Sequence, residues 1–426
     1  MSNRPETFAT EQLAAGSGSG WAIASNRAER WLSWVFVGFV ALCLVVPAVE
    51  TLYPLFGTIV SPLEERRAAS PFPSPRLLMD ANGDFAAGLN SWFDDRVGFR
   101  DLFIRSKNQI DYTLFHTSRK VFVGSDGWLF SRIADLHPIA HLDAAGLSAV
   151  EGSFVALARL LHDRGIQLVV VGYPEKSAIY PEMAPSQLLT TPAGGNYDQF
   201  RHFLSGRSDL MFIDAGDIMK REKSNIPGNV YYKTDMHATE PAQIPVVKEI
   251  IARIAQAEHR PDIVWNEKFT PAPGAWPPGH GTEARFMSLL FPPKEQKIEQ
   301  LVGAYSIGGK EPDGHWILPD PGIFDHADNG VGRPFDWEFR SLPELCPQRL
   351  PGMVLFGNSF SDAYWSIGLQ RYFCFSRRAR DPYSRFKAFY ETIPPDTKYF
   401  IFQYYEPWML NFMSEDWFLQ NSSPSK

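Results

Sequence analysis

The stretch MVLFGNSF, residues 353–360, decides how the rest of the chain is interpreted. Four apolar residues, too few for a helix, run into a Gly-Asn-Ser turn, and Ser361 and Asp362 then suit the start of a helix. Strand, sharp turn and helix is the arrangement in which many hydrolytic enzymes present a nucleophilic serine. Ser359 would then lie at the carboxyl end of a central strand, where open α/β sheets place their sites. Such turns are also common without catalysis, so the chain must supply a base, a group that orients it, and a sheet.

Further apolar stretches predict the remaining strands of that sheet. They are residues 167–171, 210–214, 371–375 and 398–404, and helical patterns at 147–164, 197–204 and 240–257 alternate with them. Buried strands separated by helices predict an α/β fold with a parallel sheet of about five strands and helices on both faces.

Three other segments depart from this alternation. Residues 84–116 have helical spacing interrupted at Gly98, and VFVGSDGWLF at 121–130 predicts a hairpin around an Asp-Gly turn. Residues 261–350 are dense in Pro and Gly and predict a long irregular excursion, of a length that is usually functional or ordered by a partner.

Composition excludes several classes of function. The chain has 426 residues, 44% hydrophobic and 21% charged, with a net charge of −7, which suits a globular protein and gives no basic tract for nucleic acid. Neither a Cys/His pattern for zinc nor a phosphate-binding glycine loop is present, so no metal and no cofactor is expected. Cys346 and Cys374 can pair only if the fold brings them together, which the sequence leaves open.

The N-terminal region predicts a membrane anchor. Residues 31–49 carry no charge and would span roughly 28 Å as a helix, close to the thickness of a hydrocarbon core. We therefore expect a disordered cytoplasmic tail at 1–30, a transmembrane helix at 31–53, a Pro-rich tether at 54–80 and a catalytic domain at 81–426. The alternatives are a buried core helix and a cleaved signal peptide, although the preceding polar region is long for the latter.

A candidate base lies in the segment TDMHATE, residues 234–240. Asp235 and His237 are two residues apart, so in an extended segment their side chains point the same way. A carboxylate beside an imidazole fixes its tautomer and stabilises the imidazolium that forms during catalysis. The alternative is a helix-capping Asp with a nearby surface His, whereas a zinc site would lack a third ligand.

Five motifs in a fixed order together resemble a known family. They are LNSWFDDRVGFR at 89–100, VFVGSDGWLF at 121–130, YPEK at 173–176 with IYPE at 179–182, TDMH at 234–237, and GNSF at 357–360. Over roughly residues 80–410 the chain resembles the periplasmic alginate O-acetyltransferases, an SGNH-hydrolase-like family of polysaccharide acetylation enzymes. Ala238 stands where that family usually has Trp, and Asn358 where it usually has Asp.

The resemblance implies a function and a place in the cell. Ser359 would accept an acetyl group with His237 as base and Asp235 as its orienting group, and a hydroxyl of an extracellular polysaccharide would then take the acetyl. The chain would be a single-pass protein of the inner membrane with its catalytic domain in the periplasm. Acetyl-CoA is absent there, so an integral membrane acyltransferase would be the donor. A carbohydrate acetylesterase and an inactive scaffold of a polysaccharide biosynthesis and secretion complex are the alternatives.

Five residues are candidates for binding substrate. Tyr173 and Lys176 follow the first strand, Gln403 and Glu406 lie at the end of the last, and Arg96 suits an acidic sugar. Each has an ordinary alternative as a surface, capping or salt-bridging residue. The second donor to the oxyanion is not identified.

Overall fold

The computed structural model describes residues 19–53, 55–56, 59–60, 69–78, 84–132, 144–189, 196–274, 277–295, 298–302, 316–317, 337–341, 343–380 and 386–406. The chain forms two compact units, Met1–Lys107 and Asn108–Lys426. Most of the predicted tail, and much of the predicted tether and excursion, lie outside the described residues.

The N-terminal unit contains α1 (Ser19–Leu52), η1 (Pro75–Leu78), α2 (Phe85–Asp94) and the first part of α3 (Arg100–Phe115). Between Glu29 and Leu52, α1 has a mean hydropathy of 2.5 and is almost wholly exposed, so by length and composition it can cross a membrane. The helix begins at Ser19, inside the part of the chain that the sequence predicted to be disordered.

Gly98 separates α2 from α3, as the interrupted periodicity predicted. Its N–H donates to Thr51 Oγ1 at 2.8 Å, and a Cβ at this position would lie 2.5 Å from the carbonyl oxygen of Pro47. The turn between the two helices therefore packs on the last turns of α1, and only glycine allows this close approach.

The second unit contains a seven-stranded sheet with the order β4-β3-β11-β9-β10-β8-β7. Five strands are parallel neighbours: β3 (Gln167–Tyr173), β4 (Leu210–Asp214), β9 (Gly352–Gly357), β10 (Phe375–Arg380) and β11 (Thr397–Tyr405). The predicted parallel sheet is confirmed. It is extended by two antiparallel strands from the predicted excursion, β8 (Trp337–Ser341) and β7 (Trp316–Ile317).

One strand was predicted at the wrong place. The apolar residues around Tyr372 form η6 (Leu369–Tyr372), and β10 begins only at Phe375. Gly368, at φ +90°, turns the chain into that short helix, and Tyr372 and Phe373 are buried without belonging to a strand of the sheet. The apolar residues here indicate burial and not a strand, and the strand itself has the polar sequence FSRRAR.

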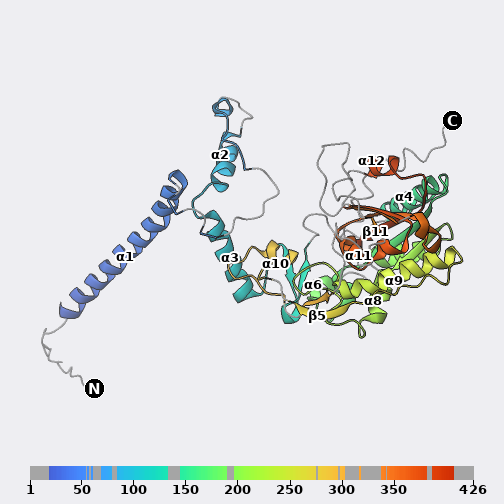
Figure 1. Ribbon diagram of the computed structural model, residues 1–426. Coiled ribbons are helices and arrows are strands. Elements are labelled where there is room, and N and C mark those ends of the chain that lie inside the picture. Colours follow the sequence, from blue (N-terminus) through green and yellow to red (C-terminus); the bar gives the residue numbers. More distant parts are fainter. Residues whose placement is uncertain are drawn as a thin grey trace, which may run out of the picture. The chain divides into compact units, whose positions relative to one another are not determined.

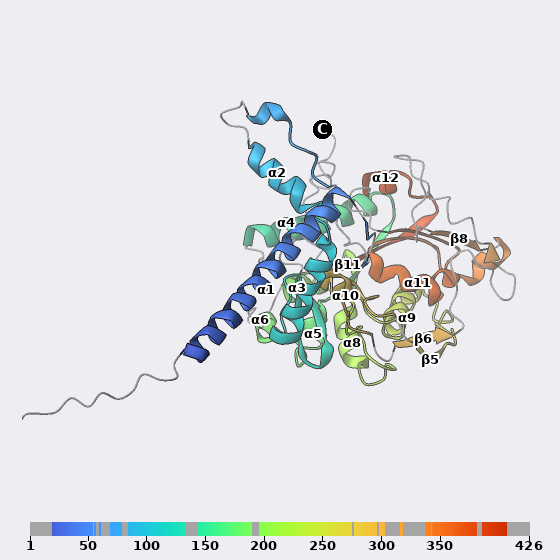
Figure 2. The same cartoon turned by 90° about the vertical axis from the view of Figure 1, so that its left-hand side faces the viewer.

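Helices cover both faces of the sheet, and alternate residues of each strand serve the two cores. Leu168 and Val170 of β3 belong to one core with α4 (Ala144–His162), α7 (Asn196–Ser205) and α12 (Phe386–Glu391). Val169 and Val171 belong to the other with α8 (Ala215–Glu222), α9 (Glu240–Ala257) and α11 (Ala363–Ser366). Figures 1 and 2 show α4 and α12 on one side of β11 and α8 and α9 on the other. Although apolar enough to span a membrane, α4 is therefore a core helix.

Short elements complete the unit. The predicted hairpin is β1 (Val121–Val123) and β2 (Leu129–Ser131) around η2 (Ser125–Gly127). The others are α5 (Lys176–Ile179), α6 (Ser186–Leu189), β5 (Thr270–Gly274), α10 (Thr282–Met287), β6 (Ile298–Val302), η4 (Pro343–Gln348) and η5 (Ser359–Asp362).

Cys346 and Cys374 form a disulfide, the pairing that the sequence left open. It links η4 to the residue before β10, and the segment it closes contains β9 and the serine turn. Cys43 is a free, exposed cysteine of α1.

Candidate active site

The serine turn begins where β9 ends. Asn358 caps η5, its side-chain Oδ1 accepting the N–H of Phe360 at 3.0 Å, while its own N–H donates to Gln403 Oε1 at 3.0 Å. A Cβ on Gly357 would lie 2.8 Å from both Gln403 Oε1 and Ser361 Oγ, so glycine is needed for the close approach. Only the carbonyl oxygen of the Asn358 side chain is used, which is the group that an Asp at this position would also supply.

A buried arginine holds the turn from the neighbouring strand. Arg378 of β10 is fully buried and donates to the carbonyl oxygen of Asn358 at 3.0 Å, to Ser361 Oγ at 2.9 Å and to the carboxylate of Asp362. Arg378 was not among the predicted site residues, because the predicted strand ended before it. The sequence FSRRAR gives no signal that Arg378 is buried while Arg377 and Arg380 are partly exposed.

Three side chains meet at the carboxyl edge of the sheet. His237 Nε2 lies 2.6 Å from Ser359 Oγ, and His237 Nδ1 lies 2.5 Å from Asp235 Oδ1. The second carboxylate oxygen of Asp235 accepts the N–H of Thr282 at 2.7 Å. Nucleophile, base and orienting carboxylate within hydrogen-bond reach form the arrangement that activates a serine.

Burial and mutual contact shift both acid–base groups. Burial acts to raise the pKa of Asp235, but its hydrogen bonds with His237, the imidazolium charge and two backbone N–H groups hold that pKa well below its usual value. Burial acts to lower the pKa of His237, yet the hydrogen bond and negative charge of Asp235 raise it above its ordinary value. Glu283 and Asp362 add to the negative potential at the imidazole.

The loop that carries the base is shaped by its ends. Tyr231 and Ala238 form an isolated antiparallel bridge, and α8 lies between β4 and this loop, so the loop does not directly follow a strand of the sheet. Ala238 is 3% exposed and belongs to the core, so it does not line an open wall of the site. The ring of Phe360 lies 4.9 Å from that of His237 and supports it.

Three of the five predicted substrate-binding residues are buried beneath the site. Tyr173 is fully buried, and its hydroxyl lies 2.7 Å from that of Tyr364. Gln403 is fully buried under the serine turn, and Lys176 is 2% exposed with its ammonium group on backbone carbonyls. These side chains support the loops around Ser359 and do not form its rim.

The other two lie elsewhere. Glu406 accepts the N–H groups of Glu175, at 3.2 Å, and Tyr197, at 3.0 Å. Burial raises the pKa of Glu406 to about 7, and burial together with the charge of Glu406 raises that of Glu175 to about 8. Arg96 belongs to the N-terminal unit, where it donates to the carbonyl of Ser70 at 2.7 Å.

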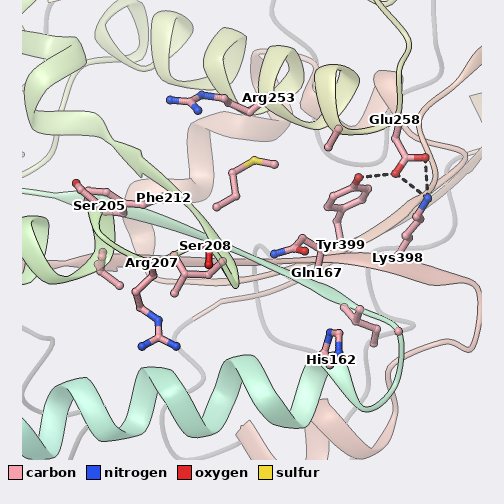
Figure 3. A pocket seen from close by; sticks show the side chains of 16 residues that line it. His162, Gln167, Ser205, Arg207, Ser208, Phe212, Arg253, Glu258, Lys398 and Tyr399 are labelled. Carbon is pink, nitrogen blue, oxygen red and sulfur yellow. Dashed lines mark hydrogen bonds and ion pairs between the residues drawn. The ribbon is translucent and has the colours of Figure 1, made fainter.

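A cavity of about 710 Å³ lies at the amino edge of the sheet, where β3, β4 and β11 begin (Figure 3). Glu258 there is 2.8 Å from Lys398 and 2.5 Å from the hydroxyl of Tyr399. The C-terminal ends of α4, α7 and α9 line the cavity, and its two arginines form ion pairs, Arg207 with Asp209 and Arg253 with Glu249. Ser359 follows the opposite end of the sheet, so this cavity is separate from the candidate active site.

Comparisons with known proteins agree with the fold. Residues 121–308 match the family model described as the SGNH hydrolase-like domain of the acetyltransferase AlgX. Asp235 and His237 lie inside the matched segment and Ser359 lies beyond it. A comparison with curated protein sequences finds no significant match.

Several solved structures are similar to the chain. The O-acetyltransferase domain of Pseudomonas putida AlgJ is 17% identical, with a TM-score of 0.44 over 72% of this chain and 99% of that one. Bacillus cereus PatB1 with a sulfonyl adduct is 14% identical, with a TM-score of 0.43 over 68% and 97%. Pseudomonas aeruginosa AlgX is 15% identical, with a TM-score of 0.36 over 72% and 69%. The chain thus carries an SGNH hydrolase-like α/β domain that resembles the AlgX acetyltransferase family, as its motifs predicted.

Proposed function

We propose that the chain is an O-acetyltransferase that transfers acetyl groups to hydroxyls of an extracellular polysaccharide through an acetylated Ser359. The observation that carries the proposal is the hydrogen-bonded series Ser359, His237 and Asp235, with separations of 2.6 and 2.5 Å. The family match over residues 121–308 supports the reaction class.

In the first half of the reaction, Ser359 Oγ attacks the carbonyl carbon of the donor acetyl ester. His237 Nε2 takes the hydroxyl proton, and Asp235 stabilises the imidazolium that forms. The tetrahedral intermediate collapses when His237 returns the proton to the leaving alcohol, and an acetyl ester of Ser359 remains. The N–H of Ser359, at the start of η5, is the first donor that we assign to the oxyanion.

In the second half, a sugar hydroxyl attacks the carbonyl carbon of the acetyl-serine. His237 Nε2 removes the hydroxyl proton and then gives it to Ser359 Oγ as the ester bond to the enzyme breaks. Each half of the reaction exchanges one ester for another and involves no redox step. His237 takes up one proton and returns it within the same half, so the protons balance.

The apolar helix and the disulfide support a proposed location. We propose that α1 spans the inner membrane and that the sheet unit lies in the periplasm, with an integral membrane acyltransferase supplying the acetyl group. The exposed apolar stretch of α1 supports the anchor, and the Cys346–Cys374 disulfide suits an oxidising compartment.

The test compares Ser359→Ala with the wild-type chain in cells that lack the native copy. We expect polymer acetylation to be lost while the amount of folded, membrane-bound protein stays the same. Unchanged acetylation with Ser359→Ala would rule out the proposed mechanism. With purified protein, faster transfer to an added oligosaccharide than hydrolysis of an aryl acetate separates a transferase from an esterase.

A scaffold without catalysis is tested separately. A fluorophosphonate should label wild-type protein at Ser359 and should not label His237→Gln, because the unassisted hydroxyl is a weak nucleophile. Absence of labelling in the wild type, with the protein folded, would favour the scaffold.

A further inference from the structure

The loop between Tyr231 and Ala238 carries His237 and is called the base loop. Its carbonyl groups converge on one buried cation. Lys176 Nζ lies 3.0 Å from the carbonyl oxygen of Tyr232, 3.3 Å from that of Lys233 and 2.9 Å from that of Asp235. Since a lysine ammonium group has three donors, these carbonyls satisfy it without water or a substrate.

The N–H groups of the same loop converge on one buried anion. The carboxylate of Glu295, a residue 4% exposed, accepts the N–H of Lys233 at 2.9 Å and that of Thr234 at 2.7 Å. It also accepts the hydroxyl of Thr234 at 2.6 Å. Lys176 thus binds carbonyl groups of this loop, and Glu295 binds N–H groups of the neighbouring peptide units.

The hairpin motif at residues 121–130 forms the wall beside the cation. Lys176 Nζ lies 5.8 Å from the ring centroid of Trp128 and 5.5 Å from that of Phe130. The N–H of Leu129 donates to the carbonyl of Lys233 at 2.8 Å. A buried charge is costly unless it is fully hydrogen-bonded, and aromatic faces add attraction for a cation.

We infer that Lys176 and Glu295 are positioning residues, a charged clamp on residues 232–235 that keeps Asp235 and His237 in line with Ser359. Only the kinetic test of this inference rests on the proposed function, because the contacts of the clamp do not depend on it. The inference also gives the hairpin and YPEK, two of the motifs that contribute no catalytic group, a role in the site.

The main variant is Lys176→Met, which keeps an unbranched apolar stem and removes the ammonium group with its three donors. Lys223→Met is the matched control, because Lys223 Nζ also donates to a backbone carbonyl, that of Ile179, and lies 3.8 Å from the ring centroid of Tyr180. Its hydrogen bonds are outside the base loop. Both proteins are studied as the full chain in detergent micelles.

For Lys176→Met we expect kcat for a small aryl acetate to fall between about tenfold and a hundredfold, since misplacing a catalytic group by about 1 Å has effects of this size. KM should change by less than about twofold, because Lys176 is buried and does not reach the substrate. Lys223→Met should leave both constants within about twofold of the wild type.

A second readout does not depend on activity. Histidine-labelled protein is titrated by nuclear magnetic resonance, with the His237 signal assigned by its loss in His237→Gln. Asp235, Glu283 and Asp362 face this imidazole, and Asp235 acts most strongly of the three. Loosening the loop should therefore shift the titration midpoint of His237 downward in Lys176→Met and leave it unchanged in Lys223→Met.

Glu295→Gln tests the other half of the clamp, and serves if Lys176→Met does not fold. We expect Glu295→Gln, like Lys176→Met, to lower kcat and to shift the titration midpoint of His237 downward. Wild-type values of both in folded Lys176→Met or Glu295→Gln would overturn the inference. The inference would also be overturned if kcat fell only in proportion to the fraction of folded protein while the titration midpoint of His237 stayed unchanged. If the wild type shows neither acyl transfer nor serine labelling, the proposed function fails, and the titration still tests the clamp.

Discussion

At the scale of single residues, Asp235 contacts more than the imidazole of His237. The residue is 6% exposed, and its carboxylate also accepts the backbone N–H groups of His237 and Thr282. An amide at this position keeps the shape but offers the wrong group to Nδ1, so His237 adopts the wrong tautomer.

We therefore predict that Asp235→Asn lowers kcat for acetyl transfer by about 10³-fold or more while the protein remains folded. Steady-state kinetics with an aryl acetate, together with a thermal melt, measures this. Ser359→Ala is the control for background hydrolysis. Activity within tenfold of the wild type would show that Asp235 is not the orienting group.

The pH dependence follows from the raised pKa of His237. Only neutral imidazole accepts the serine proton, so activity should fall as the pH drops through the pKa of His237. Because Asp235 raises that pKa, the acid limb of kcat/KM should lie above the usual range of imidazole. For the residual activity of Asp235→Asn, the acid limb of kcat/KM against pH should lie at lower pH than in the wild type. Identical limbs in the two proteins would contradict the assignment.

At the scale of elements, the strand that ends at the serine is enclosed by a covalent loop. The disulfide between Cys346 and Cys374 has a sequence separation of 28 residues and contains β9, η5 and α11. It restricts the unfolded chain in the part that carries Ser359.

Replacing both Cys346 and Cys374 by Ser should lower the free energy of unfolding of the sheet unit by about 3–4 kcal/mol. Urea unfolding followed by circular dichroism measures it, with Cys43→Ser as the matched control because that cysteine is free and exposed. A change below about 1 kcal/mol would mean that packing alone orders this loop.

The carboxyl ends of β3 and β11 bring Glu175 and Glu406 together. Burial, and then the charge of Glu406, raise the pKa of Glu175 from 4.5 to about 8, so the folded state holds a proton that the unfolded state releases. The free energy of unfolding should therefore fall as the pH rises from about 4.5 to 8.

Glu175→Gln should remove much of this dependence. We expect the variant to gain about 1 kcal/mol relative to the wild type at pH 9, and little at pH 5, where both side chains are neutral. Urea unfolding at the two pH values is the measurement. An equal effect at both would show that Glu175 is ionised throughout.

At the scale of the whole molecule, the chain joins an apolar helix to an SGNH hydrolase-like domain. The stretch Glu29–Leu52 of α1 has a mean hydropathy of 2.5 and is exposed, whereas α4, with a mean hydropathy of 1.4, packs on the sheet. Both helices pass the same test of length and composition, and they differ in hydropathy and in burial.

We predict that the full chain stays in the membrane pellet after an alkaline carbonate wash, and that a chain lacking residues 1–53 is released. A periplasmic protein that is only peripherally bound would appear in the supernatant in both cases. Retention of the shortened chain would instead indicate a second membrane contact.

The sequence by itself determined the parallel sheet, the positions of most helices and the three residues Ser359, His237 and Asp235 as candidates. These rest on local signals: buried apolar runs, helical periodicity, and residue types that suit one another chemically. Tertiary structure decided what depends on contacts between distant segments. It showed that Lys176, Tyr173 and Gln403 are supports beneath the site, that Arg378 holds the serine turn, and that Cys346 pairs with Cys374. A polar side chain near a strand end has the same sequence pattern on a rim or in the core, and only packing settles which it is.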